Sequence, residues 1–165
     1  EVIKNQLKQI INAYCQPIGV AQFVVFKFTS WNVFFLSIIQ QLFPSTKWVY
    51  IDRNTESVVQ SLMKSNGGME NWWHHPTNFL RRHFIGENYL PKNKEDYLSH
   101  LIQQHRNQAV INQNEQMLVL NYPNFLVEFD GKILTHFELD FSIEEKEKVE
   151  NIMGFDAKTG QKINN

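Results

Sequence analysis

Cysteine is nearly absent from this chain of 165 residues, which contains Cys15 alone. A single cysteine cannot form an internal disulfide, so the composition favours a reducing, cytoplasmic setting. Long hydrophobic runs are lacking too. The most apolar stretch, residues 31–43, is interrupted by polar side chains and is shorter than the ~20 apolar residues of a membrane-spanning helix. The sequence therefore predicts no membrane segment.

A strong net charge is also lacking, because the formal charge is −1 at pH 7. Such a balance gives no extended field that would recruit nucleic acid or anionic lipid, so any anion site must be local. Length and apolar content are those of one compact domain. We therefore expect a single domain over residues 1–165.

A glycine-rich phosphate loop is absent as well. None of the seven glycines opens a Gly-x-x-x-x-Gly-Lys run, the element that cradles nucleotide phosphates before a helix. This disfavours a nucleotide kinase, which needs that element to hold phosphates and magnesium. The sequence begins at Glu1, and we expect it to be part of a longer polypeptide in which such a loop could precede it.

The first third of the chain predicts alternating helices and strands. Apolar residues at helical spacing predict an amphipathic helix over 2–14, whose apolar face needs a sheet. An aromatic and β-branched run over 22–28 predicts a strand buried on both faces. Residues 31–42 should form a helix that crosses over to a second strand, 48–52, parallel to the first.

The remaining elements extend this α/β pattern. We expect a helix over 55–64, mixed helix and loop over 69–93, a helix whose buried face runs from Tyr97 through His105 to Ala109, and a third buried strand over 116–121. Ser142 and Glu145 have the spacing of a capping box, which predicts a last helix ending near Gly154.

Arg53 and Ser61 are the strongest candidate ligand-binding pair. Arg53 directly follows the predicted strand 48–52, and the carboxyl edge of parallel strands is where open α/β sheets bind ligands. Ser61 lies on the next helix, and a guanidinium with a hydroxyl suits a phosphomonoester. Ser57, one turn earlier, is a competing donor. The alternative is a surface arginine and a small packing residue.

These segments resemble the sulfotransferase family over roughly residues 20–156, most clearly between 24 and 62. The resemblance is carried by Phe26-Lys27-Phe28-Thr29, Leu42-Phe43-Pro44, Trp48-Val49-Tyr50-Ile51-Asp52-Arg53-Asn54, Ser61, the late strand Met117-Leu118-Val119-Leu120-Asn121-Tyr122, and Ile152-Met153-Gly154-Phe155. It implies a three-layer α/β fold with a parallel sheet, P-loop NTPase-like, here lacking the N-terminal strand and phosphate loop.

The resemblance also implies a function. The protein would transfer a sulfuryl group from 3′-phosphoadenosine 5′-phosphosulfate to a hydroxyl or amine on a small-molecule or glycan acceptor, without a metal. Arg53 and Ser61 would hold the 3′-phosphate of the donor, and Lys27 would stabilise charge on the leaving phosphate. For Lys27 the alternative is a side chain that reaches solvent at the sheet edge.

Two features depart from the family pattern. Many members have a histidine as general base at the position of Thr29, and a hydroxyl of ordinary acidity is a poor base at neutral pH. His74 and His75 could replace it, although surface or packing roles are favoured for both. With the missing loop, this leaves a second hypothesis open: a non-catalytic nucleotide-binding or interaction module on the same scaffold.

Overall fold

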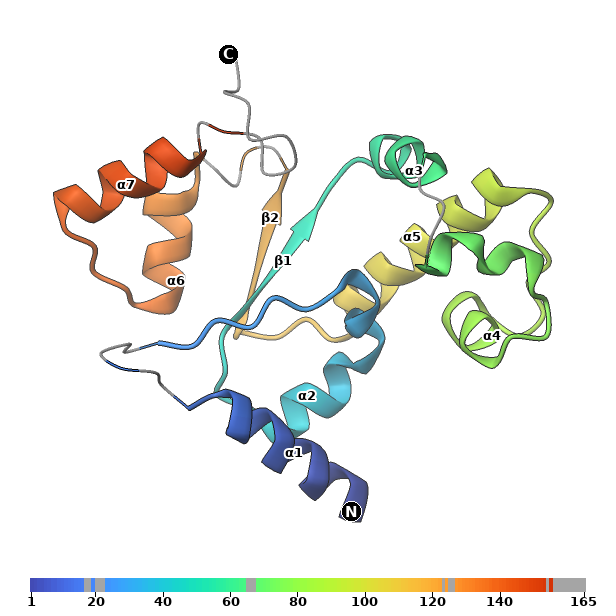
Figure 1. Ribbon diagram of the computed structural model, residues 1–165, viewed down its shortest axis with the longest axis horizontal. Helices are drawn as coiled ribbons and strands as arrows, with labels where there is room; N and C mark the ends of the chain where they lie inside the picture. The colour runs from blue at the N-terminus through green and yellow to red at the C-terminus, as the bar shows by residue number, and fades with distance from the viewer. Residues whose placement is uncertain are drawn as a thin grey trace. The chain divides into compact units, whose positions relative to one another are not determined.

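A computed structural model of the chain describes residues 1–16, 19, 23–64, 68–122, 124, 127–153 and 155. In these residues the protein is mixed α/β and mostly helical, with a small parallel sheet (Figure 1). It separates into two compact units. The first comprises residues 1–46 and 55–114, and the second comprises 47–54 and 115–165.

The first unit is helical. Its elements are α1 (Val2–Tyr14), η1 (Ser30–Phe35), α2 (Leu36–Leu42), α3 (Thr55–Met63), η2 (Gly68–His74), α4 (Phe79–Ile85) and α5 (Lys94–Ile111). Side-chain caps start two of them: Asn78 accepts a hydrogen bond from the backbone N–H of Arg81, and Asn93 accepts one from that of Asp96. Gly86 ends α4 with φ of 93°, a conformation that favours glycine.

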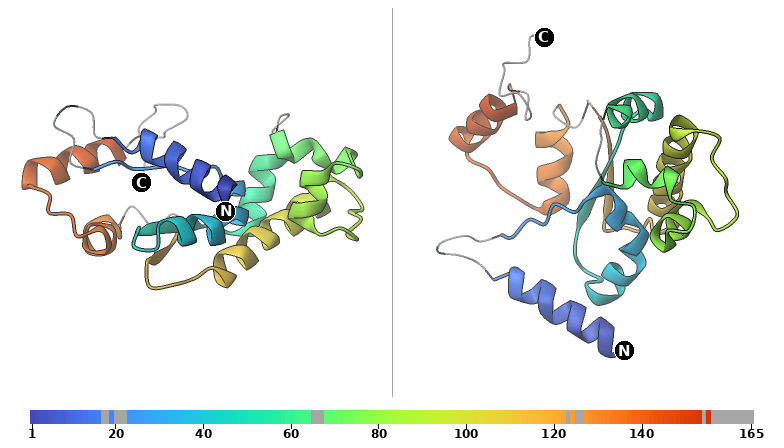
Figure 2. Two further views of the ribbon diagram at one scale, coloured as in Figure 1. Left: turned by 90° about the horizontal axis from the view of Figure 1, so that it is seen from below. Right: turned by 45° about the vertical axis from the view of Figure 1, so that its right-hand side comes forward.

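The core of the first unit lies where α3 and α4 meet α5. Its buried residues are Val59, Phe84, Ile85, Tyr97, Leu98 and Leu101. Phe84 is at its centre, with the Phe34 ring stacked on it at 4.5 Å between centroids. Figure 2 shows the green and yellow helices α3, α4 and α5 gathered together. The predicted buried face of residues 97–109 is therefore confirmed, because Tyr97, His105 and Ala109 are all buried.

The second unit contains the sheet. Strand β1 (Trp48–Asp52) pairs in parallel with β2 (Met117–Asn121), with Trp48 opposite Met117 and Asp52 opposite Asn121. Three helical elements follow: η3 (Phe129–Leu134), a stretch of π-helix, then α6 (Thr135–Phe137) and α7 (Ile143–Met153). The capping box is formed: the backbone N–H of Ser142 donates to Glu145, and that of Glu145 donates to the Ser142 hydroxyl.

The predicted strand 22–28 is not formed. Gln22 lies outside the described residues, and residues 23–29 have neither helical nor strand structure. The expected burial is wrong as well, because Phe23 is 62% exposed and Val25 is 90% exposed. A β-forming composition produces a strand only where a neighbouring strand takes its hydrogen bonds, and β1 has β2 as its partner in the described sheet.

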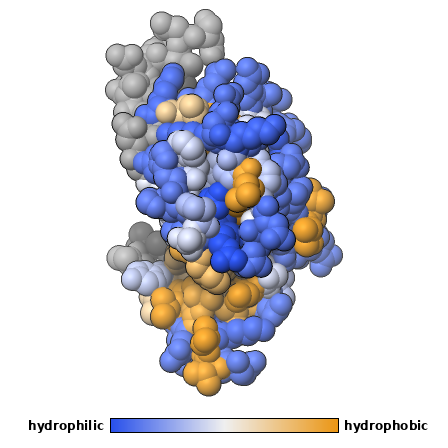
Figure 3. All heavy atoms as spheres, turned by 90° about the vertical axis from the view of Figure 1, so that its right-hand side faces the viewer, coloured by the Kyte–Doolittle hydropathy of each residue, from blue (hydrophilic) through white to orange (hydrophobic). Residues whose placement is uncertain are grey.

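The N-terminal helix α1 forms as predicted and belongs to the first unit, whereas the sheet belongs to the second. It contacts α2, and none of its residues is buried. The exposed residues Val2, Ile3, Ile10 and Tyr14 lie on its apolar side. Figure 3 shows hydrophobic residues gathered at the lower end of the molecule, where α1 and α2 lie in Figure 1.

Candidate functional site

Arg53 and Tyr122 meet at the carboxyl edge of the parallel pair. Because Asp52 lies opposite Asn121, the residues that follow leave the sheet side by side. The backbone N–H of Tyr122 donates to the Asp52 carbonyl at 2.7 Å, which extends the ladder by one step. The guanidinium carbon of Arg53 then lies 4.6 Å from the centroid of the Tyr122 ring. This edge is the candidate site.

The contact between Arg53 and Tyr122 places a fixed cation over an aromatic face. Both side chains are exposed, so the attraction is modest, about 0.5–1 kcal/mol for contacts of this kind. Its main consequence is geometric, because the contact restricts where the guanidinium can lie at the end of the strand.

Ser61 and Ser57 lie on α3 in the first unit, whereas Arg53 belongs to the second. Ser61 is exposed and Ser57 is half-buried. At the start of α3, the Thr55 hydroxyl accepts a hydrogen bond from the guanidinium of Arg106, which ties the helix to α5. The structure thus does not bring Arg53 and Ser61 together within one unit, and their joint binding of a phosphate stays a prediction.

Lys27 and Thr29 lie in the first unit, in the segment without secondary structure, and both are exposed. The Thr29 carbonyl accepts a hydrogen bond from the backbone N–H of Asn32 at 3.0 Å and so begins η1. Within the described residues, Lys27 therefore lies on an open segment and not at the end of a buried strand.

The aromatic segment around His74 and His75 has a packing role in part. Trp72 and Trp73 pack against the core of the first unit, and the Trp72 ring stacks on Phe84 at 6.3 Å. His74 is exposed, with its ring 3.8 Å from that of Trp73, and His75 is exposed too. The two histidine side chains are thus accessible to solvent, while the tryptophans beside them pack against the core.

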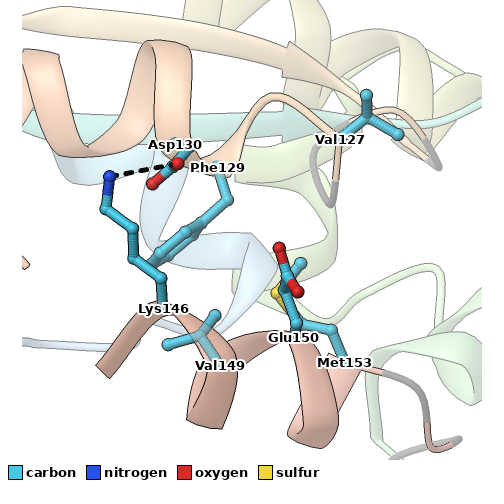
Figure 4. Close-up of a pocket in the computed structure, with 7 residues that line it drawn as sticks. All are labelled: Val127, Phe129, Asp130, Lys146, Val149, Glu150 and Met153. Carbon is cyan, nitrogen blue, oxygen red and sulfur yellow. Dashed lines mark hydrogen bonds and ion pairs between the residues drawn. The ribbon is translucent and has the colours of Figure 1, made fainter. Parts of the chain in front are cut away.

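A pocket of about 280 Å³ lies in the second unit between η3 and α7 (Figure 4). Its lining residues are Val127, Phe129, Asp130, Lys146, Val149, Glu150 and Met153. The Lys146 amine points at Asp130, with 3.1 Å between Nζ and Oδ2, and the Phe129 ring lies beside it. With two acids to one paired lysine, this pocket does not favour a phosphate.

Arg81 and His105 are polar side chains buried in the first unit. Arg81 is 2% exposed, donates to the Pro76 carbonyl at 3.4 Å and lies over the Tyr97 ring, whose pKa burial raises to about 12. His105 is 6% exposed, and burial lowers its pKa to about 4. The helical period predicted that His105 faces inward, whereas no feature of the sequence distinguished Arg81 from the exposed Arg82.

The described part of the chain has neither a metal-binding cluster nor a membrane-spanning helix. No group of three or more His, Cys, Asp or Glu residues there is arranged to hold a metal ion. No helix there has the length and apolar character needed to cross a bilayer.

No protein-family model, curated protein or solved structure matches the chain.

Proposed function

We propose that this chain is a sulfotransferase that uses 3′-phosphoadenosine 5′-phosphosulfate, on a P-loop NTPase-like scaffold. Arg53 anchors the 3′-phosphate of the nucleotide, and Ser61 is the second donor that the family resemblance implies. The observation that carries the proposal is the position of Arg53, directly after a parallel strand and against Tyr122, which follows the neighbouring strand. Both strand ends belong to the segments on which the resemblance depends.

The position of Arg53 supports the proposal for a physical reason. Ligands of open α/β sheets bind outside the carboxyl ends of parallel strands, and Arg53 presents a permanent positive charge there. A guanidinium binds phosphate oxygens with two parallel N–H bonds, which a lysine cannot reproduce. The strand register and the aromatic contact both restrict where this group can lie, and such restriction lowers the entropic cost of binding.

The transfer itself needs little acid–base chemistry at the donor. The acceptor oxygen or nitrogen attacks sulfur, the bond from sulfur to the bridging phosphate oxygen breaks, and negative charge develops on the departing 3′-phosphoadenosine 5′-phosphate. Lys27 is proposed to stabilise that charge. The acceptor proton passes to a base other than Thr29, for which the exposed His74 and His75 are candidates.

The second candidate function is a non-catalytic nucleotide-binding or interaction module on the same scaffold. Two observations favour it: Thr29 stands where many members of the family have the catalytic histidine, and no glycine of the sequence opens a phosphate loop. Both functions share the nucleotide site at Arg53, so binding and turnover have to be measured separately.

Calorimetric titration with 3′-phosphoadenosine 5′-phosphate tests the shared site. Arg53→Ala should weaken binding by about 30- to 150-fold, the equivalent of ~2–3 kcal/mol for a lost charged hydrogen bond. Arg82→Ala is the matched control, because it removes an exposed arginine from α4 with the same change in charge. Equal affinity in the parent and Arg53→Ala would exclude the proposed site.

Turnover then separates the enzyme from the module. With a radiolabelled sulfate donor and a broad panel of hydroxyl and amine acceptors, the proposal expects labelled product from the parent. It expects strongly reduced product from Lys27→Ala. Nucleotide binding without any labelled product would favour the module.

A further inference from the structure

Residues 23–28, the sequence Phe-Val-Val-Phe-Lys-Phe, form an exposed segment that leads toward η1 and α2 (Figure 1). Every large apolar residue in it is at least 40% exposed. Among the residues that the structure describes, none forms a backbone hydrogen bond with this segment. Its amides and carbonyls thus have no backbone partner in the described part of the chain, which is unusual for a run of this composition.

The segment nevertheless has the properties of a strand. Five of its six residues are aromatic or β-branched, the types that sheets favour, and it contains no glycine or proline. Its exposure alternates, with Val24, Phe26 and Phe28 at 40–44% and Phe23 and Val25 at 62% and 90%. The Phe26 and Phe28 rings stack at 6.1 Å between centroids, as expected of residues on one side of an extended chain.

The backbone of residues 23–28, which has no hydrogen-bond partner among the described residues, indicates which kind of partner could bind there. A lipid surface could cover the aromatic side chains, but it offers no regular row of donors and acceptors for the amides and carbonyls. A second extended strand offers both, since strand addition combines main-chain hydrogen bonds with contacts between alternate side chains. The occupant that satisfies the whole segment is therefore a peptide strand.

The charge of the segment indicates which residues its partner should contain. Lys27 is the one charged residue of the segment, and it is exposed. A second copy of the segment would meet the first with like charge and no compensating acid. A partner strand with acidic residues meets it with opposite charge, and opposite charges across strands are stabilising.

We propose that residues 23–28 are a docking site for an extended partner peptide. This peptide has alternating apolar side chains and at least one acidic residue, and it pairs with the segment through backbone hydrogen bonds. Its apolar side chains cover Val24, Phe26 and Phe28. Arg53 lies outside this segment, whereas Lys27, the proposed stabiliser of the leaving phosphate, lies within it, so peptide binding is tested with variants of Val25 and not of Lys27.

The test uses the full chain and a synthetic probe, a capped peptide of alternating valine and threonine with a glutamate at each end. Binding is followed by amide NMR shifts of residues 23–28. The same peptide methylated on alternate backbone nitrogens is the matched control, because it keeps every side chain but loses backbone N–H donors.

Two variants test the protein side of the pairing. Val25→Pro removes one backbone N–H, and Val25→Thr keeps it with a side chain of similar shape. Val25 is 90% exposed, so circular dichroism should show the parent fold for both variants.

The proposal expects saturable shifts for the parent and for Val25→Thr. It expects at least a tenfold weaker response for Val25→Pro and for the methylated peptide. Absence of saturable shifts, or equal binding of the methylated peptide, overturns it. So does self-association of the chain that Val25→Pro abolishes, because the occupant is then a second copy. Binding of residues 23–28 to phosphatidylserine vesicles, without any response to the peptide, overturns it as well.

Discussion

The guanidinium carbon of Arg53 lies 4.6 Å from the ring centroid of Tyr122, although 68 positions separate the two residues in the sequence. Their proximity is a direct consequence of the parallel register, which sets Asp52 opposite Asn121 and lets the next residue of each strand leave the sheet at the same point. It joins the two strand ends that the sequence singled out separately. It is also the contact most open to measurement in the candidate site.

A double-mutant cycle measures this contact. Arg53→Ala and Tyr122→Leu should show a coupling of about 0.5–1 kcal/mol in the free energy of unfolding, the range of exposed cation–π pairs. Tyr122→Phe keeps the ring and should retain the coupling. Urea denaturation of the two single variants and the double variant provides the values. Strictly additive effects would mean that the contact contributes no energy.

The burial of His105 predicts that the protein loses stability in acid. Burial lowers its folded pKa to about 4 from 6.5, so the folded state disfavours the protonated ring. Its contribution is fully present above pH 6.5 and is lost as the pH falls from 6.5 toward 4, because the unfolded chain then binds the proton more tightly. Between pH 8 and pH 5 the loss should be about 2 kcal/mol.

Urea denaturation at the two pH values tests this, with His105→Leu to remove the titrating group. That variant should lose most of the difference between pH 8 and pH 5. His74→Gln is the matched control, because it removes an exposed histidine from the same unit. A difference that survives intact in His105→Leu would contradict the assignment.

Phe84 should be the most sensitive aromatic position of the first unit. It is 1% exposed, and the rings of Phe34 and Trp72 stack on it. Phe84→Ala should cost about 3–5 kcal/mol of unfolding free energy, because it leaves a cavity among rigid rings. Phe79→Ala, on the same helix but 78% exposed, should change stability by less than ~0.5 kcal/mol. Chemical denaturation measures the free energy of unfolding of both variants. Similar losses in the two would contradict the placement of Phe84 in the core.

The capping box at the start of α7 predicts a local effect. Ser142→Ala removes the hydroxyl that accepts the backbone N–H of Glu145, so amide exchange in the first turn should become roughly fivefold faster. The hydrogen bond from the backbone N–H of Ser142 lowers the pKa of Glu145 below its ordinary value of 4.5. Its contribution is present above pH 4.5 and is lost as the pH falls through the lowered value.

Hydrogen-exchange NMR at neutral and acid pH follows both effects at α7. Ser37→Ala, an exposed serine within α2, serves as a control without a capping role. Unchanged exchange in the first turn of Ser142→Ala would show that the capping hydrogen bonds do not stabilise the helix.

Local signals in the sequence predicted many of the elements. The strand at 48–52, the helix that buries His105 and the capping box at Ser142 all formed where their patterns indicated. Each of these patterns involves residues that are close together in the sequence. Such patterns can be recognised because side-chain periodicity follows local backbone geometry. The candidate site was predicted in part, since Arg53 and Tyr122 were each placed at a strand end.

The sequence by itself thus determined the helices α1, α3, α5 and α7, the strands β1 and β2, and where the charged residues fall along them. Only the tertiary structure decided that β1 pairs with β2, that residues 23–28 pair with no strand in the described part of the chain, and that Arg81 is buried while Arg82 is exposed. The physical reason is that strand pairing and side-chain burial depend on surfaces brought together from distant parts of the chain. Two runs with equal β-forming composition differ in structure when only one of them meets a partner strand.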